Sequence, residues 1–101
     1  MQSPQAVTAL AALAHESRLA AFRLLVQAGP EGLAASRIAE ALDIAASSLS
    51  FHLKELAHAG LVTSRQEGRF VIYAARYDAM IELLAFLTEN CCNGKPCIPN
   101  C

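Results

Sequence analysis

The sequence predicts a mostly helical α+β domain that carries one β-hairpin. Hydrophobic residues make up 54% of the 101 residues but aromatic residues only 6%, and much of the apolar content is alanine. This composition favours close-packed helices over a sheet sandwich. Apolar residues recur at helical spacing along most of the chain, whereas the stretch 61–74 is rich in β-branched residues. A chain of this length forms one domain, which we assign to residues 1–90, and 91–101 form a cysteine-rich tail.

Four helices are expected in the first sixty residues. Residues 6–14 are rich in alanine and form the first helix. Ser17 can cap a second helix that runs to about residue 28, where a Gly-Pro-Glu-Gly sequence ends it. A short helix over 36–42 and a longer one over 46–59 follow, joined by about three residues. Gly60 is suited to terminate the longer helix.

The period of the sequence changes after residue 60. Residues 61–65 and 70–74 read as two strands, and the Gln-Glu-Gly-Arg sequence at 66–69 reads as the turn between them. A last helix is expected over 77–89. The tail that follows contains two prolines and a glycine, so it cannot continue that helix.

No segment predicts export or a membrane span. The N-terminus lacks a basic region followed by an apolar stretch, and no apolar run approaches the ~18 residues that a membrane span needs. We therefore expect a cytoplasmic protein with reduced thiols and no membrane partner. The net charge of −1 argues by itself against a nucleic-acid binder. Between residues 47 and 76, however, four cations stand against two anions, a local excess of two that a dimer doubles.

Two short helices with a brief connection, followed by a hairpin, are the pattern of a winged helix-turn-helix. In the second of these helices Leu49, Leu53 and Leu56 can pack inward while the opposite side presents small polar groups to a major groove. The candidate DNA contacts are Ser47, Ser48, Ser50, Phe51, His52, Lys54, Arg65 and Arg69. The alternative is an ordinary helical hairpin whose serines are only surface residues.

Each candidate contact has a distinct chemistry. Serine hydroxyls can serve phosphates or base edges, and His52 and Lys54 can reach phosphates. Phe51 can contact a thymine methyl group or simply pack. Arg65 and Arg69 flank the predicted hairpin tip and would lie beside the DNA backbone or a minor groove.

Three segments resemble the ArsR/SmtB family of metal-responsive repressors, over roughly residues 8–88. They are Leu-Ala-His-Glu-Ser-Arg-Leu at 13–19, Ile-Ala-Glu-Ala-Leu at 38–42, and the Ser-x-His-Leu-x-x-Leu-x-x-x-Gly-Leu-Val run that ends at residue 62. The resemblance implies a homodimer that binds double-stranded, palindromic operator DNA, with its first and last helices at the dimer interface. The apolar candidates for that interface are Leu10, Leu13, Ile81, Leu84 and Leu87. The alternative is that they belong to the core of one chain.

Some positions depart from the family pattern. Ala45 stands where the family usually has a capping Ser or Thr before the recognition helix, and Ser47 can take over that cap. One family arsenic site needs a Cys-x-Cys motif within 33–38, which contains no cysteine, and a family zinc site needs a histidine where Met80 stands. The three histidines, His15, His52 and His58, are expected at the surface or near phosphates rather than as metal ligands.

All four cysteines lie in the tail, at Cys91, Cys92, Cys97 and Cys101. The adjacent pair resembles the C-terminal cysteine pairs of arsenite-responsive family members. Trivalent arsenic takes three thiolates in a pyramid, and Gly94 lets the chain fold back so that Cys97 or Cys101 supplies the third. Structural zinc would want four ligands and a Cys-x-x-Cys spacing, which is missing here.

The sequence thus predicts a repressor that an As(III) ion, or Sb(III), releases from operator DNA, with no organic cofactor. Four thiolates could also hold Cd(II), Pb(II) or Cu(I), and a thiol–disulfide switch could join Cys91 or Cys92 to Cys97 or Cys101. A tail without a role remains a further alternative. An enzyme is not expected, because these thiols follow a helix C-terminus, where the dipole disfavours thiolate. A metal-storage module would leave the serine-rich helix without a purpose.

Overall fold

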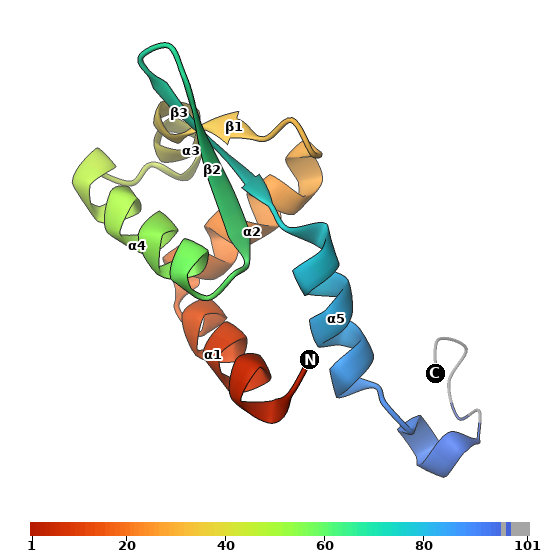
Figure 1. The fold of residues 1–101 in the computed structure, drawn as a ribbon. Coiled ribbons are helices and arrows are strands. Elements are labelled where there is room, and N and C mark those ends of the chain that lie inside the picture. The colour runs from red at the N-terminus through yellow and green to blue at the C-terminus, as the bar shows by residue number, and fades with distance from the viewer. Residues whose placement is uncertain (96, 98–101) are drawn as a thin grey trace.

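A computed structural model describes residues 1–95 and 97 of the chain. The helices are α1 (Ser3–Leu13), α2 (Glu16–Ala28), α3 (Ala35–Leu42), α4 (Ala46–His58) and α5 (Tyr77–Leu87), and a short 3-10 helix, η1 (Cys91–Gly94), comes after them. The strands are β1 (Leu33–Ala34), β2 (Val62–Glu67) and β3 (Phe70–Ala75). The predicted order of four helices, a hairpin and a last helix is confirmed (Figure 1).

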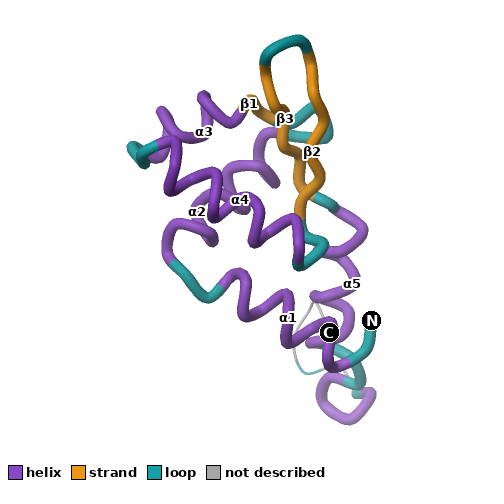
Figure 2. Tube along the Cα trace, turned by 60° about the vertical axis from the view of Figure 1, so that its left-hand side comes forward, coloured by secondary structure: helices purple, strands orange, loops and turns teal. Residues whose placement is uncertain are grey.

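The three strands form an antiparallel sheet in the order β1-β3-β2. Along the β2–β3 hairpin Val62 is opposite Ala75 and Glu67 is opposite Phe70. The hairpin projects beyond the helices as a wing (Figure 2). Strand β1, in which Leu33 pairs with Tyr73, is an element that the sequence did not predict. Two residues are too few to show a period of two, so only the pairing partner reveals such a strand.

Two helix starts differ from the sequence prediction. His15 is the N-cap of α2, and its Nδ1 accepts a hydrogen bond from the backbone N–H of Ser17 at 3.1 Å. The prediction that Ser17 caps this helix was therefore wrong. Ala45 is the N-cap of α4 and has no side chain to cap with, and Ser47 does not replace it. Ser47 is instead an exposed residue in the first turn of α4.

The first and last helices also have shifted ends. Helix α1 begins at Ser3, earlier than expected, because Gln2 and Gln5 form a reciprocal capping box and a proline occupies the first turn. Helix α5 ends at Leu87 rather than near Glu89. There the Thr88 hydroxyl donates to the carbonyl of Leu84 at 2.8 Å, and the αL conformation of Asn90 turns the chain away from the helix axis.

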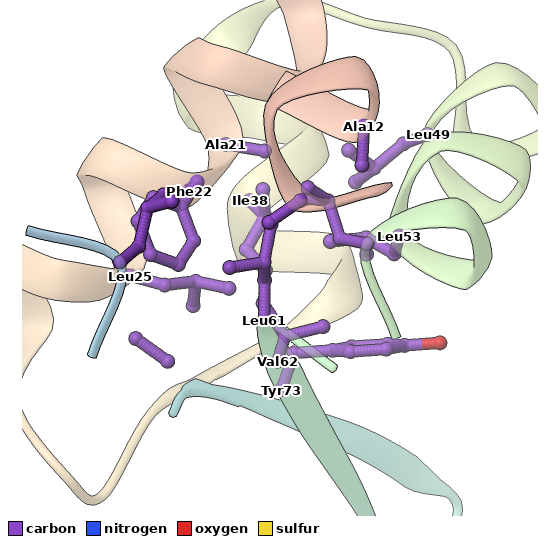
Figure 3. Packing of buried hydrophobic residues seen from close by; sticks show 14 of the residues in the cluster. Ala12, Ala21, Phe22, Leu25, Ile38, Leu49, Leu53, Leu61, Val62 and Tyr73 are labelled. Atoms are coloured by element: carbon purple, nitrogen blue, oxygen red, sulfur yellow. The ribbon is translucent and has the colours of Figure 1, made fainter. Parts of the chain in front are cut away.

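Helix α2 packs against α1, α3, α4 and β3, and its buried side chains belong to the hydrophobic core (Figure 3). Its residues Ala21, Phe22 and Leu25 are buried. The buried side chains that surround them include Ile38, Leu49, Leu53, Leu56, Leu61 and Tyr73. A buried leucine of this kind contributes about 1.5–3 kcal/mol. The core therefore fixes α4 against α2 and leaves the opposite side of α4 in solvent.

The ends of α2 and α5 are joined by a hydrogen bond. The Tyr77 hydroxyl donates to the carbonyl oxygen of Val26 at 2.9 Å, and the Leu25 carbonyl lies 3.3 Å away. These carbonyls belong to the last turn of α2, whose carbonyl groups have no partners within the helix. Tyr77 thereby fixes the beginning of α5 to the end of α2.

Replacing Gly32 by alanine should destabilise the domain by about 3 kcal/mol or more. Its φ of +74° disfavours any other residue, and a Cβ there would overlap the carbonyl oxygen of Tyr73 on β3. Gly68→Ala is the matched control, because its φ is +61° but nothing lies within 4 Å of the added Cβ. We expect the control to cost about 1 kcal/mol. Urea unfolding of both variants measures the difference, and equal losses would contradict the overlap at Gly32.

Candidate DNA-binding surface and thiol site

The exposed side of α4 carries most of the predicted DNA contacts. Leu49, Leu53 and Leu56 are at most 1% exposed and turn one side of the helix into the core. The side chains on the outward arc are Ser47, Ser48, Ser50, Phe51 and Lys54, all exposed. Phe51 is 56% exposed, so its ring is accessible on this side of the helix. The structure thus gathers three hydroxyls, one ammonium and one aromatic ring on one accessible helix surface.

His52 lies at the edge of this arc and turns back toward α2. Arg18 Nε donates a hydrogen bond to His52 Nδ1 at 3.2 Å. The rings of His15 and His52 lie 4.5 Å apart, and the Arg18 guanidinium carbon lies 5.6 Å from the centre of the Phe51 ring. Burial, followed by the nearby His15 and Arg18 charges, lowers the pKa of His52 below its ordinary value. The lowered pKa favours the neutral imidazole of His52, which can act as a hydrogen-bond acceptor.

Arg18 was not among the predicted DNA contacts. It is separated from His52 by 34 positions, so no local sequence pattern links the two side chains. The only sequence signal was the resemblance itself, since Arg18 belongs to one of the segments that carry it. His58, the third histidine, is exposed in the last turn of α4.

The two wing arginines have different surroundings. Arg65 Nε pairs with Glu67 Oε2 at 2.5 Å, and its Nη2 donates to the carbonyl oxygen of Glu31 at 2.8 Å. Arg65 thus ties the wing to the loop between α2 and β1. Arg69 is exposed beside Gly68 at the hairpin turn. Of the two arginines, Arg69 lies at the tip of the hairpin, where a DNA contact outside the recognition helix was predicted.

The thiol site lies just after α5, at the end of the molecule opposite the wing (Figure 1). The sulfurs of Cys91, Cys92 and Cys97 all lie within 4.8 Å of one another. The Cys91 sulfur is 3.9 Å from that of Cys92 and 3.8 Å from that of Cys97, and a disulfide joins Cys92 to Cys97. Cys101, the fourth predicted ligand, lies outside the described residues.

The backbone explains how these thiols converge. Asn90, Cys92 and Asn93 have φ values of 55°, 55° and 58°. Asparagine tolerates this left-handed region better than most residues, and Gly94 continues it with a φ of 84°. The chain therefore reverses within a few residues and brings Cys97 back to the adjacent pair. Cys92 and Cys97 are exposed and Cys91 is half-buried, so this turn of the chain lies at the surface of the protein.

Helices α1 and α5 expose an apolar surface. Its members are Val7, Leu10, Ile81, Leu84 and Leu87, each between 42% and 65% exposed. Leu13, the other predicted interface residue, is half-buried. Leu13 and Leu84 line a mainly apolar hollow of about 260 Å³ between α2 and α5. Exposed apolar residues gathered on neighbouring helices are typical of a protein interface.

Comparisons with known proteins fit this arrangement. A family model described as a helix-turn-helix domain matches residues 13–65, more than half of the chain. An 80-residue segment is 39% identical to a Halobacterium salinarum protein that is named as an arsenical resistance operon repressor, ArsR. This segment covers 77% of the chain and 61% of the relative. The chain belongs to the ArsR family of transcription regulators.

Solved structures agree with this family assignment. An ArsR-like transcriptional regulator from Rhodococcus sp. RHA1 superposes with a TM-score of 0.76 at 25% identity, covering 90% of this chain and 83% of that one. A homodimeric winged helix-turn-helix DNA-binding domain from Mycobacterium bovis gives a TM-score of 0.70 at 26% identity, covering 91% and 85%. The fold and relatives of this ArsR-family chain are thus those of DNA-binding transcription regulators and not of enzymes.

This ArsR-family chain spans about three fifths of the length of the Halobacterium relative, so the function of that whole protein does not transfer directly. Within residues 1–95 and 97, no helix has the length and apolar character that crossing a bilayer requires.

Mild oxidation of the reduced protein should link Cys92 to Cys97 in preference to the adjacent pair Cys91–Cys92. The turn brings Cys92 and Cys97 together, whereas neighbouring cysteines bridge each other only with strain. Peptide mapping by mass spectrometry without reduction identifies the linked peptides. In a Cys97→Ser variant the 92–97 link is removed and the yield of intrachain disulfide should fall. A dominant link between Cys91 and Cys92 would contradict the observed geometry.

Proposed function

We propose that this protein is a dimeric repressor that binds operator DNA and releases it when As(III) binds the thiols of the tail. The observation that carries the proposal is the convergence of three cysteine sulfurs within 4.8 Å directly after the last helix of a winged helix-turn-helix. The name of the Halobacterium relative, an arsenical resistance operon repressor, supports the same inducer.

DNA binding is assigned to α4 and the wing. Helix α4 would enter the major groove, where the hydroxyls of Ser47, Ser48 and Ser50 serve base edges or phosphates and Lys54 serves a phosphate. Phe51 can cover a thymine methyl group because its ring is exposed on the same arc. Arg69 at the wing tip would reach the adjacent backbone or minor groove. The buried leucines of α4 already hold these groups on the exposed side of the helix, so no rearrangement is needed to expose them.

A dimer provides the second half of the DNA contact. A second copy of the chain would bury the exposed apolar residues of α1 and α5. In a two-fold interface the same residues of both copies take part. The homodimeric Mycobacterium bovis domain, which has the same fold, supports this arrangement. Two copies would place two α4 helices for successive major grooves of a palindromic operator.

The chemistry of the tail suits trivalent arsenic. One molecule of arsenous acid reacts with three thiols to form three As–S bonds, and three water molecules leave. The three sulfurs would have to be reduced first, since Cys92 and Cys97 are joined in the structure. Cys91, Cys92 and Cys97 then offer three soft donors from one turn of the chain, and Sb(III) would bind in the same way. A four-thiolate site for Cd(II), Pb(II) or Cu(I) would also need Cys101.

Release of DNA follows from where the site lies. The thiol turn continues directly from α5, and α5 carries the exposed apolar residues of the proposed interface. Closing the turn around an ion would fix the end of α5 and change how two copies pack, which changes the spacing of the two α4 helices. A coupling of about 1–3 kcal/mol would weaken operator binding by roughly 5–150-fold.

Arsenite should release the reduced protein from its upstream DNA at near-stoichiometric amounts, while zinc should have little effect. Fluorescence anisotropy of labelled DNA follows the release. The double variant Cys91→Ser/Cys92→Ser should bind DNA normally and no longer respond, because only two thiols remain.

Two single variants identify the third ligand. Cys97→Ser should abolish the response, and Cys101→Ser, the matched control, should retain it. Release of the double variant by arsenite would overturn the site. Failure of the wild-type chain to bind any DNA from its own upstream region would overturn the proposed function.

Thiol oxidation is a second candidate signal, favoured by the Cys92–Cys97 disulfide in the structure. Hydrogen peroxide would take two electrons and two protons from the pair and form two water molecules. The same two sulfurs would then be unavailable to As(III). The anisotropy assay separates the two signals, because release by arsenite persists in an excess of a non-thiol reductant and release by peroxide does not.

Replacing Ile81 by glutamate should convert the dimer to monomers at micromolar concentration. Ile81 is 60% exposed on α5. In a two-fold interface a glutamate at this position would be buried against the glutamate of the second copy or against apolar side chains, and burying an unpaired charge is unfavourable. Phe70→Glu is the control, because Phe70 is 54% exposed but lies on the wing. Sedimentation equilibrium measures both masses, and a dimeric Ile81→Glu variant would contradict the proposed interface.

A further inference from the structure

Arg18 lies on α2, outside the recognition helix, yet its side chain reaches the exposed surface of α4. We propose that Arg18 is a second DNA contact, which binds a backbone phosphate beside the recognition helix and is held in position by His52. This inference rests on the proposed operator binding and adds a contact that the predicted set of DNA-binding residues did not contain.

The hydrogen-bonding groups of Arg18 favour a phosphate ligand. A guanidinium carries five N–H donors, and in the described structure only Nε has an assigned acceptor, His52 Nδ1 at 3.2 Å. The bond through Nε leaves the two terminal amino groups at the far end of the side chain. These form the planar fork that binds two oxygens of one phosphate. Within residues 1–95 and 97, Arg18 forms no ion pair.

Phe51 places this fork beside the DNA-facing surface. The guanidinium carbon of Arg18 lies 5.6 Å from the centre of the Phe51 ring, within the range of a cation–π contact. The ring is 56% exposed on the arc that also carries the three serines. A duplex that reaches Phe51 would therefore bring its sugar–phosphate backbone close to Arg18.

His52 acts as a positioning residue for Arg18. It is half-buried between the two helices, and its Nδ1 must carry a lone pair to accept from Arg18. A protonated imidazole has no lone pair to offer. Burial and the His15 and Arg18 charges lower the pKa of His52, which favours the neutral ring that accepts from Arg18. The His15 ring also contacts the His52 ring in a tilted arrangement, with the two ring centres 4.5 Å apart.

Nearby charges determine whether the fork stays available. His15 and Glu16 begin α2, and Lys54 follows His52 on α4. Glu55 and His58 line, together with Arg18, a hollow of about 360 Å³ between α1 and α4. Glu55 is the carboxylate that lines this hollow with Arg18, and the described structure contains no ion pair between the two. The bond to His52 and the contact with Phe51 keep Arg18 on the DNA side of α4.

The salt dependence of DNA binding tests the contact. Operator affinity of reduced wild-type protein and of Arg18→Ala is measured by anisotropy between 50 and 300 mM salt, conditions chosen to span a strong electrostatic dependence. A lost phosphate contact lowers the slope of log K against log salt by about 0.9, hence by about 2 for a dimer. Affinity at the low-salt end should fall on the order of tenfold or more.

Arg23→Ala is the matched control. It removes the same charge from an exposed position of the same helix, lining the hollow beside α5. Its slope should equal that of the wild type. Thermal unfolding and sedimentation confirm that each variant folds and keeps the oligomeric state of the wild type.

Two substitutions at His52 test the positioning role. The Oδ1 oxygen of asparagine occupies nearly the place of imidazole Nδ1, so His52→Asn should retain the affinity and slope of the wild type. His52→Gln places its amide where Nε2 lies, so Arg18 loses its acceptor and both quantities should fall. A purely structural role of His52 would lower the melting temperature without changing the slope.

The outcomes separate this inference from the proposed function. A reduced slope for Arg18→Ala with an unchanged one for Arg23→Ala supports the contact. Wild-type binding with a slope that Arg18→Ala leaves unchanged overturns the contact and keeps the repressor. Equal behaviour of the two His52 variants overturns the positioning role. If the wild-type protein fails to bind operator DNA, the proposed function itself is wrong.

Discussion

The packing of α2 against α4 is the contact on which the rest of the structure depends. Ala21 and Leu25 are completely buried, and they face the three leucines that fix the inner side of α4. Because this inner side is fully apolar, the outer side of α4 must be turned to solvent, with its serines and its exposed phenylalanine. The proposed DNA-facing surface is therefore a consequence of core packing, and we expect it to be rigid because protein cores are close-packed.

Helix α2 also connects the two ends of the molecule. At its C-terminus the Tyr77 hydroxyl holds the start of α5 against Val26, and at its N-terminal turn Arg18 holds His52 of α4. The two hydrogen bonds thus connect α5 and α4 to opposite ends of the same helix, α2.

The sequence predicted the features whose signal is local. Helical spacing of leucines gave α4, the change of period at residue 61 gave the hairpin, and the clustering of cysteines gave the thiol site. What it missed depends on contacts between distant segments. Strand β1 exists because Leu33 meets Tyr73, 40 positions later, and the Arg18–His52 bond spans 34 positions. The cap of α2 was misassigned for another reason: serine is the commoner cap, but here a histidine ring accepts the bond.

The distance between the thiols and the wing limits how an inducer can act. The molecule measures 50 Å along its longest axis, with the thiol turn at one end and the wing at the other (Figures 1 and 2). In the proposed mechanism, an ion bound at Cys91, Cys92 and Cys97 lies too far away to compete with DNA for the surface of α4, so it would have to bind two arrangements of the dimer with different affinity. Because α5 is the only described helix that adjoins the thiol turn and also carries exposed apolar residues, the proposal places the difference between those arrangements in how α5 packs. A repressor built this way needs no movement within its DNA-binding core, only a change in the spacing of two rigid copies.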